Sequence, residues 1–162
     1  MSRREQIQMT PDEVRAFLDE QRTVICATNG VRGYPHLMPL WYVVRDSAAD
    51  GGPELWAWTF AKSQKIKNLE RDARATLQVE DGTEYHLLRG VMLECEVELV
   101  RDLDAVTDLG TEILGRYSGS PDGTLPEEGR GLVAAQAAKR VGMRFVESRR
   151  ASWDHRKLGG VY

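Results

Sequence analysis

The stretch 55–72, LWAWTFAKSQKIKNLERD, passes from an apolar segment to a strongly charged one. Its first half predicts a strand over 54–60, because aromatic and apolar residues of this kind favour a pleated, half-buried surface. Its second half predicts a short helix with Ser63 as the N-cap. Two apolar residues three positions apart, Ile66 and Leu69, face inward in that helix. The stretch is therefore expected to be a strand, a tight turn and a helix.

Hydroxyl and ammonium groups gather where this strand passes into the helix. Thr59 ends the strand, and Lys62 and Lys65 flank the capping Ser63. Ammonium groups pair with phosphate, and hydroxyls and the N–H groups of a helix start donate directed hydrogen bonds. The segment therefore predicts an anion-binding site, and it lacks the GxxxxGK[ST] pattern of a P-loop. The alternative from the residues alone is a solvated, lysine-rich helix face.

Apolar and alternating segments separated by turn residues predict six strands. The dipeptide Asn29-Gly30 is typical of a hairpin between the first two strands. Pro35 and Pro39 cannot donate to a ladder, so the second strand is expected at an edge or with a bulge. The strands are expected at about 23–28, 35–45, 54–60, 74–81, 87–102 and 140–154.

Helices are expected between and before these strands. The N-terminal one has Thr10 as its N-cap, Pro11 in the first position and Glu13 to complete a capping box. Two more are expected over 102–117 and 132–139, joined by a polar loop, and residues 1–9 are expected to form a flexible tail. Residues 10–162 then form one domain. Its fold class is mainly β (α+β): a six-stranded antiparallel β-barrel with short peripheral helices covering its open ends.

Composition excludes several classes of protein. The chain has 162 residues and a net charge of −3, whereas nucleic-acid-binding domains are usually basic. No apolar run is long enough to cross a bilayer, and the N-terminus does not resemble a signal peptide, so a cytoplasmic protein is expected. Cys26 and Cys95 lie in apolar or alternating runs, which predicts buried free thiols. The three histidines are too scattered to suggest a metal site.

Four segments together resemble a known family. They are GYPHLMPLWYV at 33–43, LWAWTFAKSQKIKNLERDARATLQV at 55–79, LLRGV at 87–91 and SWDHRKLGG at 152–160. In this order they resemble the FMN-binding split-barrel flavin and deazaflavin oxidoreductases that are related to pyridoxamine 5′-phosphate oxidase. More narrowly, they resemble the actinobacterial branch that uses coenzyme F-420. The resemblance runs from about Thr10 to the C-terminus.

The resemblance implies a homodimer with a cofactor groove between the protomers. The phosphate would meet Thr59, Ser63 and Lys65, with Lys62 as a weaker candidate. The ring system would lie along the second strand, beside backbone groups of four residues: His36, Met38, Pro39 and Leu40.

Three further residues are implied at the groove, and each has an ordinary structural alternative. Gln78 would bond the ring, or else be an outward polar residue of an alternating strand. Arg89 would pair with an acidic cofactor tail, or else be a surface charge. Trp153 would cover the ring or the substrate from the partner subunit, or else pack in the dimer interface.

Two departures separate the chain from a true pyridoxamine 5′-phosphate oxidase. Those oxidases have an arginine near the position of Met38, and their arginine-containing C-terminal signature is replaced here by WDHRKLGGVY. Both departures favour the F-420 branch.

The function that this branch implies is hydride transfer from reduced F-420 to a small electrophilic organic molecule. No catalytic side chain is expected, because the hard chemistry belongs to the cofactor. One alternative is an FMN-binding, pyridoxamine 5′-phosphate oxidase-like flavoprotein. A second alternative is a non-catalytic carrier of F-420, flavin or haem, in which His86 or His155 would be the axial ligand of haem iron.

Overall fold

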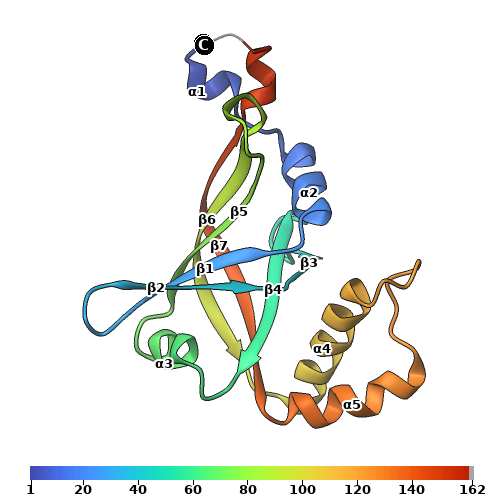
Figure 1. Cartoon of the computed structure of the whole chain (residues 1–162). Coiled ribbons are helices and arrows are strands. Elements are labelled where there is room, and N and C mark those ends of the chain that lie inside the picture. Colours follow the sequence, from blue (N-terminus) through green and yellow to red (C-terminus); the bar gives the residue numbers. More distant parts are fainter. Residues whose placement is uncertain (161–162) are drawn as a thin grey trace.

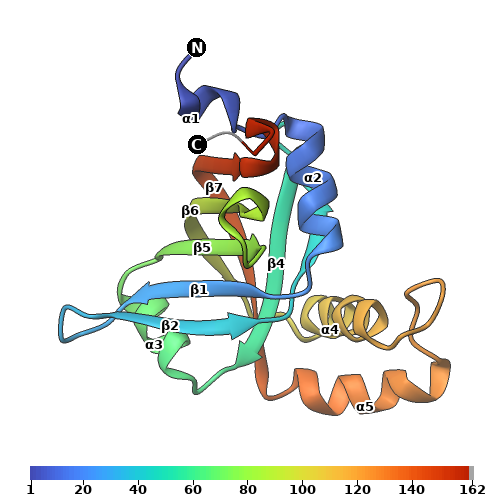
Figure 2. The same ribbon diagram turned by 45° about the horizontal axis from the view of Figure 1, so that its top comes forward.

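The fold is a strongly curled antiparallel sheet with helices at its ends, and the computed structural model describes residues 1–160 (Figure 1). The strands are hydrogen-bonded in the order β2-β1-β5-β6-β7-β4-β3. Figure 2 shows β7, β6, β5, β1 and β2 side by side, with β4 running across them. The strand bounds are β1 (Val24–Asn29), β2 (Pro35–Leu40), β3 (Val43–Asp46), β4 (Pro53–Phe60), β5 (Arg74–Asp81), β6 (Arg89–Val100) and β7 (Arg140–Asp154).

The sheet has seven strands, so the prediction of six was wrong. The predicted second strand changes its partner at Trp41 and Tyr42: Leu40 pairs with β1, whereas Val43 pairs with β4. Tyr42 leaves the ladder because its backbone N–H donates to the hydroxyl of Tyr117 and its own hydroxyl donates to the carbonyl of Leu18. One expected strand is therefore two, β2 and β3.

This change of partner produces the split of the barrel. β2 and β3 are the two outermost strands of the sheet, yet only residues 41–42 separate them along the chain. A link of two residues spans only about 10 Å, so the sheet must curl until its two edges lie close together. The hydrogen-bonded ladder itself is not closed between these edges.

The helices largely follow the predicted caps. Thr10 and Glu13 form the expected capping box of α2, and Ser63 caps α3. A helix within residues 3–6, capped by Ser2, was not predicted. α5 also begins five residues earlier than the predicted 132. The bounds are α1 (Arg3–Gln6), α2 (Pro11–Glu20), α3 (Gln64–Arg71), α4 (Leu103–Tyr117), α5 (Glu127–Ala137), η1 (Tyr85–Leu87) and η2 (His155–Leu158).

Two apolar cores hold the elements together. The larger one fills the barrel with alternate residues of the strands and with Phe17 and Leu18 of α2. The smaller one lies where α4 and α5 pack against β3 and β4, around Trp58 and Ile113. Gly110 of α4 allows this close packing, because a Cβ there would lie 2.3 Å from the ring of Trp58.

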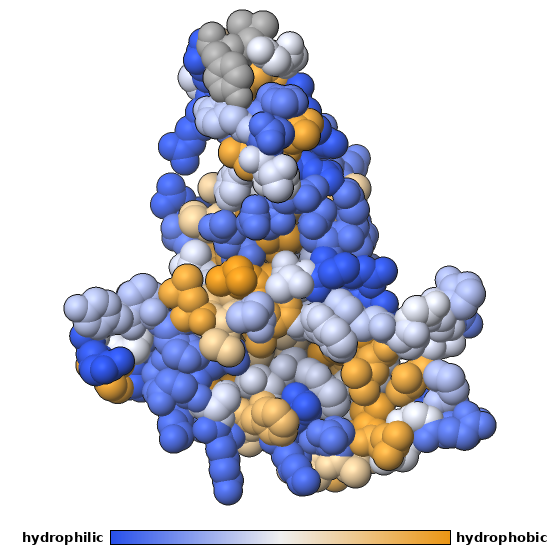
Figure 3. Space-filling model, viewed as in Figure 1, coloured by the Kyte–Doolittle hydropathy of each residue, from blue (hydrophilic) through white to orange (hydrophobic). Residues whose placement is uncertain are grey.

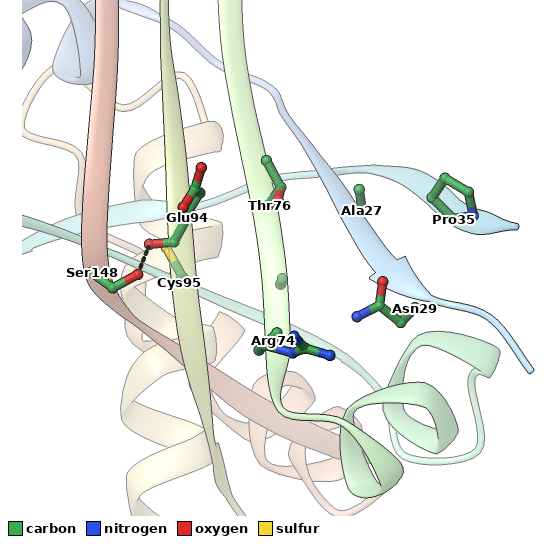
Figure 4. Close-up of a pocket in the computed structure, with 9 residues that line it drawn as sticks. Ala27, Asn29, Pro35, Arg74, Thr76, Glu94, Cys95 and Ser148 are labelled. Carbon is green, nitrogen blue, oxygen red and sulfur yellow. Dashed lines mark hydrogen bonds between the residues drawn. The ribbon is translucent and has the colours of Figure 1, made fainter. Parts of the chain in front are cut away.

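The outer face of β2, β1, β5, β6 and β7 remains partly exposed. In-register neighbours on this face include Leu37, Ala27 and Thr76 on three successive strands. A pocket lies here, and Figure 4 shows three of the residues that line it, Ala27, Thr76 and Glu94, on neighbouring strands. Figure 3 shows hydrophobic side chains in the middle of the molecule, where Figure 1 draws β1 and β2. We refer to this surface as the outer sheet face.

Candidate functional site

A cavity of about 650 Å³ lies at the split of the barrel. β4 pairs with β3 only as far as Trp56, so the last part of β4 has an open edge beside the end of β2. This volume falls within the roughly 300–1,000 Å³ of small-molecule and cofactor pockets. The residues that line it are Thr23, Pro39, Leu40, Trp41, Trp58, Thr59, Leu114, Gln136 and Arg140.

Thr59 of this cavity is joined to a buried lysine. The Nζ atom of Lys65 donates to Oγ1 of Thr59 at 3.2 Å, and the two residues are only 4% and 7% exposed. Within residues 1–160, Lys65 forms no ion pair with a carboxylate. Burial lowers the pKa of Lys65, and the nearby thiol of Cys26 opposes this shift. The ammonium group is thus short of a partner, as expected of a group that receives an anion.

The other residues of the predicted anion site lie at the start of α3. The hydroxyl of Ser63 accepts a hydrogen bond from the N–H of Ile66, as an N-cap does. Lys62 and Lys67 are exposed on either side of this cap. The strand, turn and helix of the predicted site are therefore present, and Lys65 is buried instead of solvated.

The predicted residues of β2 divide between two cavities. Pro39 and Leu40 line the cavity at the split, and Met38 precedes them in the same strand, partly exposed. His36 lines a second cavity of about 330 Å³ together with Gln64 and Asn68 of α3. Its Nδ1 atom is buried and has no hydrogen-bond partner among the described residues.

Three predicted residues do not reach the cavity at the split within one chain. Gln78 is exposed on the outer sheet face, in register with Met92. Trp153 lies on the same face, with its ring against Gly90, where an added Cβ would lie 2.3 Å from the ring.

The third, Arg89, is held by two carboxylates. Its guanidinium bonds Glu20 at 2.5 Å and Asp81 at 2.8 Å, and it lies over the ring of Phe17. An acidic cofactor tail would have to compete with these two partners for Arg89.

Sequence reasoning missed six of the nine residues that line the cavity, among them Arg140 and Trp41. Arg140, the first residue of β7, pairs with Phe60 at the end of β4. Trp41 stacks on Tyr117 of α4, with ring centroids 4.3 Å apart. Trp41 belongs to the segment 33–43 but was given no role in the site, whereas Arg140 lies outside the four segments and reaches the site through the register of β4 against β7.

The histidines proposed as haem ligands lie at the other end of the sheet. Nδ1 of His155 is 2.8 Å from the carbonyl oxygen of Tyr85, in the pair of short helices η1 and η2. Figure 1 shows this end far from α4 and α5, which border the cavity. Over the part of the chain that the structure describes, no cluster of side chains is arranged for a metal ion. Nor is any helix within residues 1–160 long and apolar enough to cross a membrane.

Solved structures with the same architecture include three informative ones. A conserved hypothetical protein of Mycobacterium tuberculosis, Rv2991, is 40% identical over 100% of this chain and 95% of its own, with a TM-score of 0.86. A protein described as an F-420 reductase is 20% identical, with a TM-score of 0.64 over 85% of this chain and 94% of its own. An FAD-binding protein from Mesorhizobium loti is 19% identical, with a TM-score of 0.64 over 90% and 94% of the two chains. The last two likenesses show the fold alone.

Sequence comparison gives the family. No curated protein matches the chain. Residues 10–146 match the profile of the family described as pyridoxamine 5′-phosphate oxidase, which is most of the chain. The resemblance to the split-barrel flavin and deazaflavin proteins is therefore confirmed, and this chain belongs to the pyridoxamine 5′-phosphate oxidase family.

Proposed function

We propose that this protein binds coenzyme F-420 in the cavity at the split and is a reductase of a small electrophilic organic molecule. The observation that carries the proposal is the buried Lys65, which contacts Thr59 of the cavity and has no carboxylate partner among the described residues. An anion at this place would satisfy a charge that burial otherwise makes costly.

The described residues fit such a cofactor in three respects. Lys65, Thr59 and the cap at Ser63 offer an ammonium group and hydroxyls to a phosphate. Pro39 and Leu40 offer an apolar edge to a planar ring. Exposed Lys62 lies beside the cap, and it would attract the acidic glutamyl tail that distinguishes F-420 from FMN.

The protein would bind the cofactor and the acceptor, orient them toward each other and exclude water from the cavity. Reduced F-420, when bound, supplies a hydride to an electrophilic acceptor. The residues that line the cavity include no Asp, Glu, His or Cys within the described chain, so no side-chain acid or base faces the acceptor there. Protonation of the product is then a task for water, and we assign no catalytic residue.

We also infer a homodimer that pairs through the outer sheet face. Leu37 is 56% exposed there, and Gln78 and Trp153 lie on the same face although the cavity of their own chain does not include them. Pairing would cover this apolar surface and would bring those two residues to a groove shared by two protomers. Trp153 would then cover the ring or the substrate from the partner subunit.

The test is titration of the purified protein with F-420 and, separately, with FMN, followed by the fluorescence of each cofactor. Lys65→Met removes the buried ammonium group, and Lys67→Met removes an exposed one from the same helix as the matched control. We expect F-420 to bind, with an affinity reduced at least about tenfold in Lys65→Met and nearly unchanged in Lys67→Met. Binding of FMN alone would support the flavoprotein alternative, and binding of neither cofactor would overturn the proposal.

A further inference from the structure

Arg140 is a cation of the cavity that has no counter-ion among the described residues. The centre of its guanidinium lies 4.5 Å from the ring centroid of Trp58 and 4.3 Å from that of Phe60. Its Nε atom is buried and has no hydrogen-bond partner among the described residues, and no carboxylate of residues 1–160 forms an ion pair with it. Arg144, on the same strand, pairs with Glu54 and Glu98. Arginines of β7 can thus find carboxylate partners, and Arg140 differs from Arg144 in having none among the described residues.

The two aromatic rings hold Arg140 in place, but they do not satisfy its hydrogen bonds. Cation–π contacts attract the charge of a guanidinium, whereas its planar N–H groups match the two oxygens of a carboxylate. Burial lowers the pKa of Arg140, which reflects the cost of the unpaired charge. An anionic group on a ligand would remove that cost.

Arg140 and Lys65 lie on opposite sides of β4. Side chains alternate between the faces of a strand, so Thr59, which bonds Lys65, points away from the face of Trp58 and Phe60, which hold Arg140. Both faces border the cavity, because Trp58 and Thr59 both line it. Arg140 lines the cavity itself, whereas Lys65 reaches it only through its bond to Thr59, and the proposed cofactor phosphate uses only Lys65.

Trp41 adds a flat, rigid wall to the same cavity. Its ring is stacked on Tyr117 at an interplanar angle of 9°, yet the residue is still 51% exposed. Tyr117 is fixed in turn, since its hydroxyl donates to the carbonyl of Arg22 at 2.7 Å and accepts from the N–H of Tyr42 at 3.2 Å. A ring held in this way favours stacking with a planar ligand, because little side-chain freedom remains to be lost.

We infer that the molecule reduced at this site is a planar, conjugated carboxylic acid, which stacks on Trp41 and pairs its carboxylate with Arg140. This inference rests on the proposed function, because F-420 is assumed to occupy the side of Lys65. Arg140 is the only ionisable residue among those that line the cavity in the described chain, so a carboxylate meets no repulsion there. A neutral analogue of the same shape would keep the stacking and lose the ion pair.

The experiment compares trans-cinnamate with trans-cinnamamide, an acid and a neutral amide of the same planar shape. Calorimetry measures the affinity for each compound twice, once with the free protein and once with the protein loaded with F-420. We expect the wild-type protein to prefer the acid by about 10- to 100-fold, the range that a charge-assisted pair supplies. Arg140→Met should abolish this preference, and Trp41→Leu should weaken both compounds equally. Lys139→Met, which removes the neighbouring exposed charge, should change neither affinity.

Two outcomes would overturn the inference. The first is equal affinity of the wild-type protein for acid and amide, a result that does not depend on any variant folding. The second is that Arg140→Met lowers the affinity for F-420 and leaves that for cinnamate unchanged, because Arg140 would then belong to the cofactor. Failure of the proposed function looks different: F-420 does not bind, while the preference for the acid and its loss in Arg140→Met support the anion site.

Discussion

Lys65 and Thr59 are joined by a hydrogen bond of 3.2 Å between two buried side chains, and Thr59 lines the cavity at the split. A lysine in this position is costly to the free protein, because one neutral hydroxyl replaces the water and counter-ions of an exposed ammonium group. The same position gives a strong attraction to an anionic ligand, because the local dielectric is low. The pair therefore has opposite effects on the stability of the free protein and on ligand binding.

Lys65→Met should separate these two effects. We expect its free energy of unfolding at pH 7 to equal that of the wild-type protein or to exceed it by about 1–2 kcal/mol, because an unpaired buried charge is removed. Burial lowers the pKa of Lys65 below the 10.5 of a free lysine, so the unfolded chain holds the proton more tightly. The wild-type protein gains stability as pH rises through the lowered pKa toward 10.5, and the advantage of the variant shrinks over this window. Urea unfolding at pH 7 and pH 10 measures the difference.

Lys67→Met is the control for this measurement, since Lys67 is exposed on the same helix. Its difference from the wild-type protein should be small and should not change over the same window. A large loss of stability in Lys65→Met at every pH would contradict the interpretation, because it would make the bond to Thr59 a structural requirement.

The packing of α4 against β4 gives a second prediction. A Cβ at Gly110 would lie 2.3 Å from Cζ3 of Trp58, which lines the cavity. Alanine favours a helix over glycine by about 1 kcal/mol. We still expect Gly110→Ala to destabilise the protein by about 1–3 kcal/mol, because the ring has to move in a packed core. Thermal unfolding measures the change in stability. Titration with F-420 measures whether the displaced ring of Trp58 changes the affinity for the cofactor.

Gly131→Ala is the matched control for that substitution. Gly131 also lies within a helix, α5, and an added Cβ there meets no atom within 4 Å. This variant should be more stable than the wild-type protein by up to about 1 kcal/mol. If Gly110→Ala stabilised the protein to the same extent, the contact between α4 and Trp58 would be looser than the structure indicates.

The sequence predicted the parts of the fold that depend on neighbouring residues. Thr10 and Glu13 form a capping box because both partners lie in one turn, and the start of α3 at Ser63 is local in the same way. The strand, turn and helix around Thr59 were likewise predicted, because they follow one another along the chain. A flexible tail over 1–9 was expected, whereas Ser2 and Glu5 cap a helix in this segment.

The features that sequence reasoning missed depend on contacts between distant residues. The break between β2 and β3 occurs because Tyr42 bonds α2 and α4, which lie at least 20 residues away along the chain. Arg140 lies 80 residues beyond its neighbour Phe60 and reaches the cavity only through the register of β4 against β7. No local pattern contains this information.

Asp154 gives a prediction at acid pH. This buried carboxylate bonds Arg156 at 2.6 Å, and the bond holds the pKa of Asp154 below its usual value. We expect Asp154→Asn to lose about 2 kcal/mol at pH 7, the cost of removing a charge-assisted pair. The stabilisation by Asp154 is present above a pH of about 4 and is lost as pH falls through the lowered pKa, so the difference between the two proteins should be smaller at pH 2 than at pH 7. An equal difference at both pH values would contradict a charge-based role.

The outer sheet face gives the last prediction, which tests the proposed dimer. Leu37 is exposed on this face beside Ala27, and a carboxylate at its position would be buried without a partner in a symmetric dimer. We expect the wild-type protein to be a dimer in light scattering at micromolar concentration and Leu37→Glu to be largely monomeric. The control is Leu132→Glu on α5, which is at least as exposed but lies away from this face. Since the proposed groove lies between protomers, monomeric Leu37→Glu should also bind F-420 more weakly, and a monomeric wild-type protein would refute the shared groove.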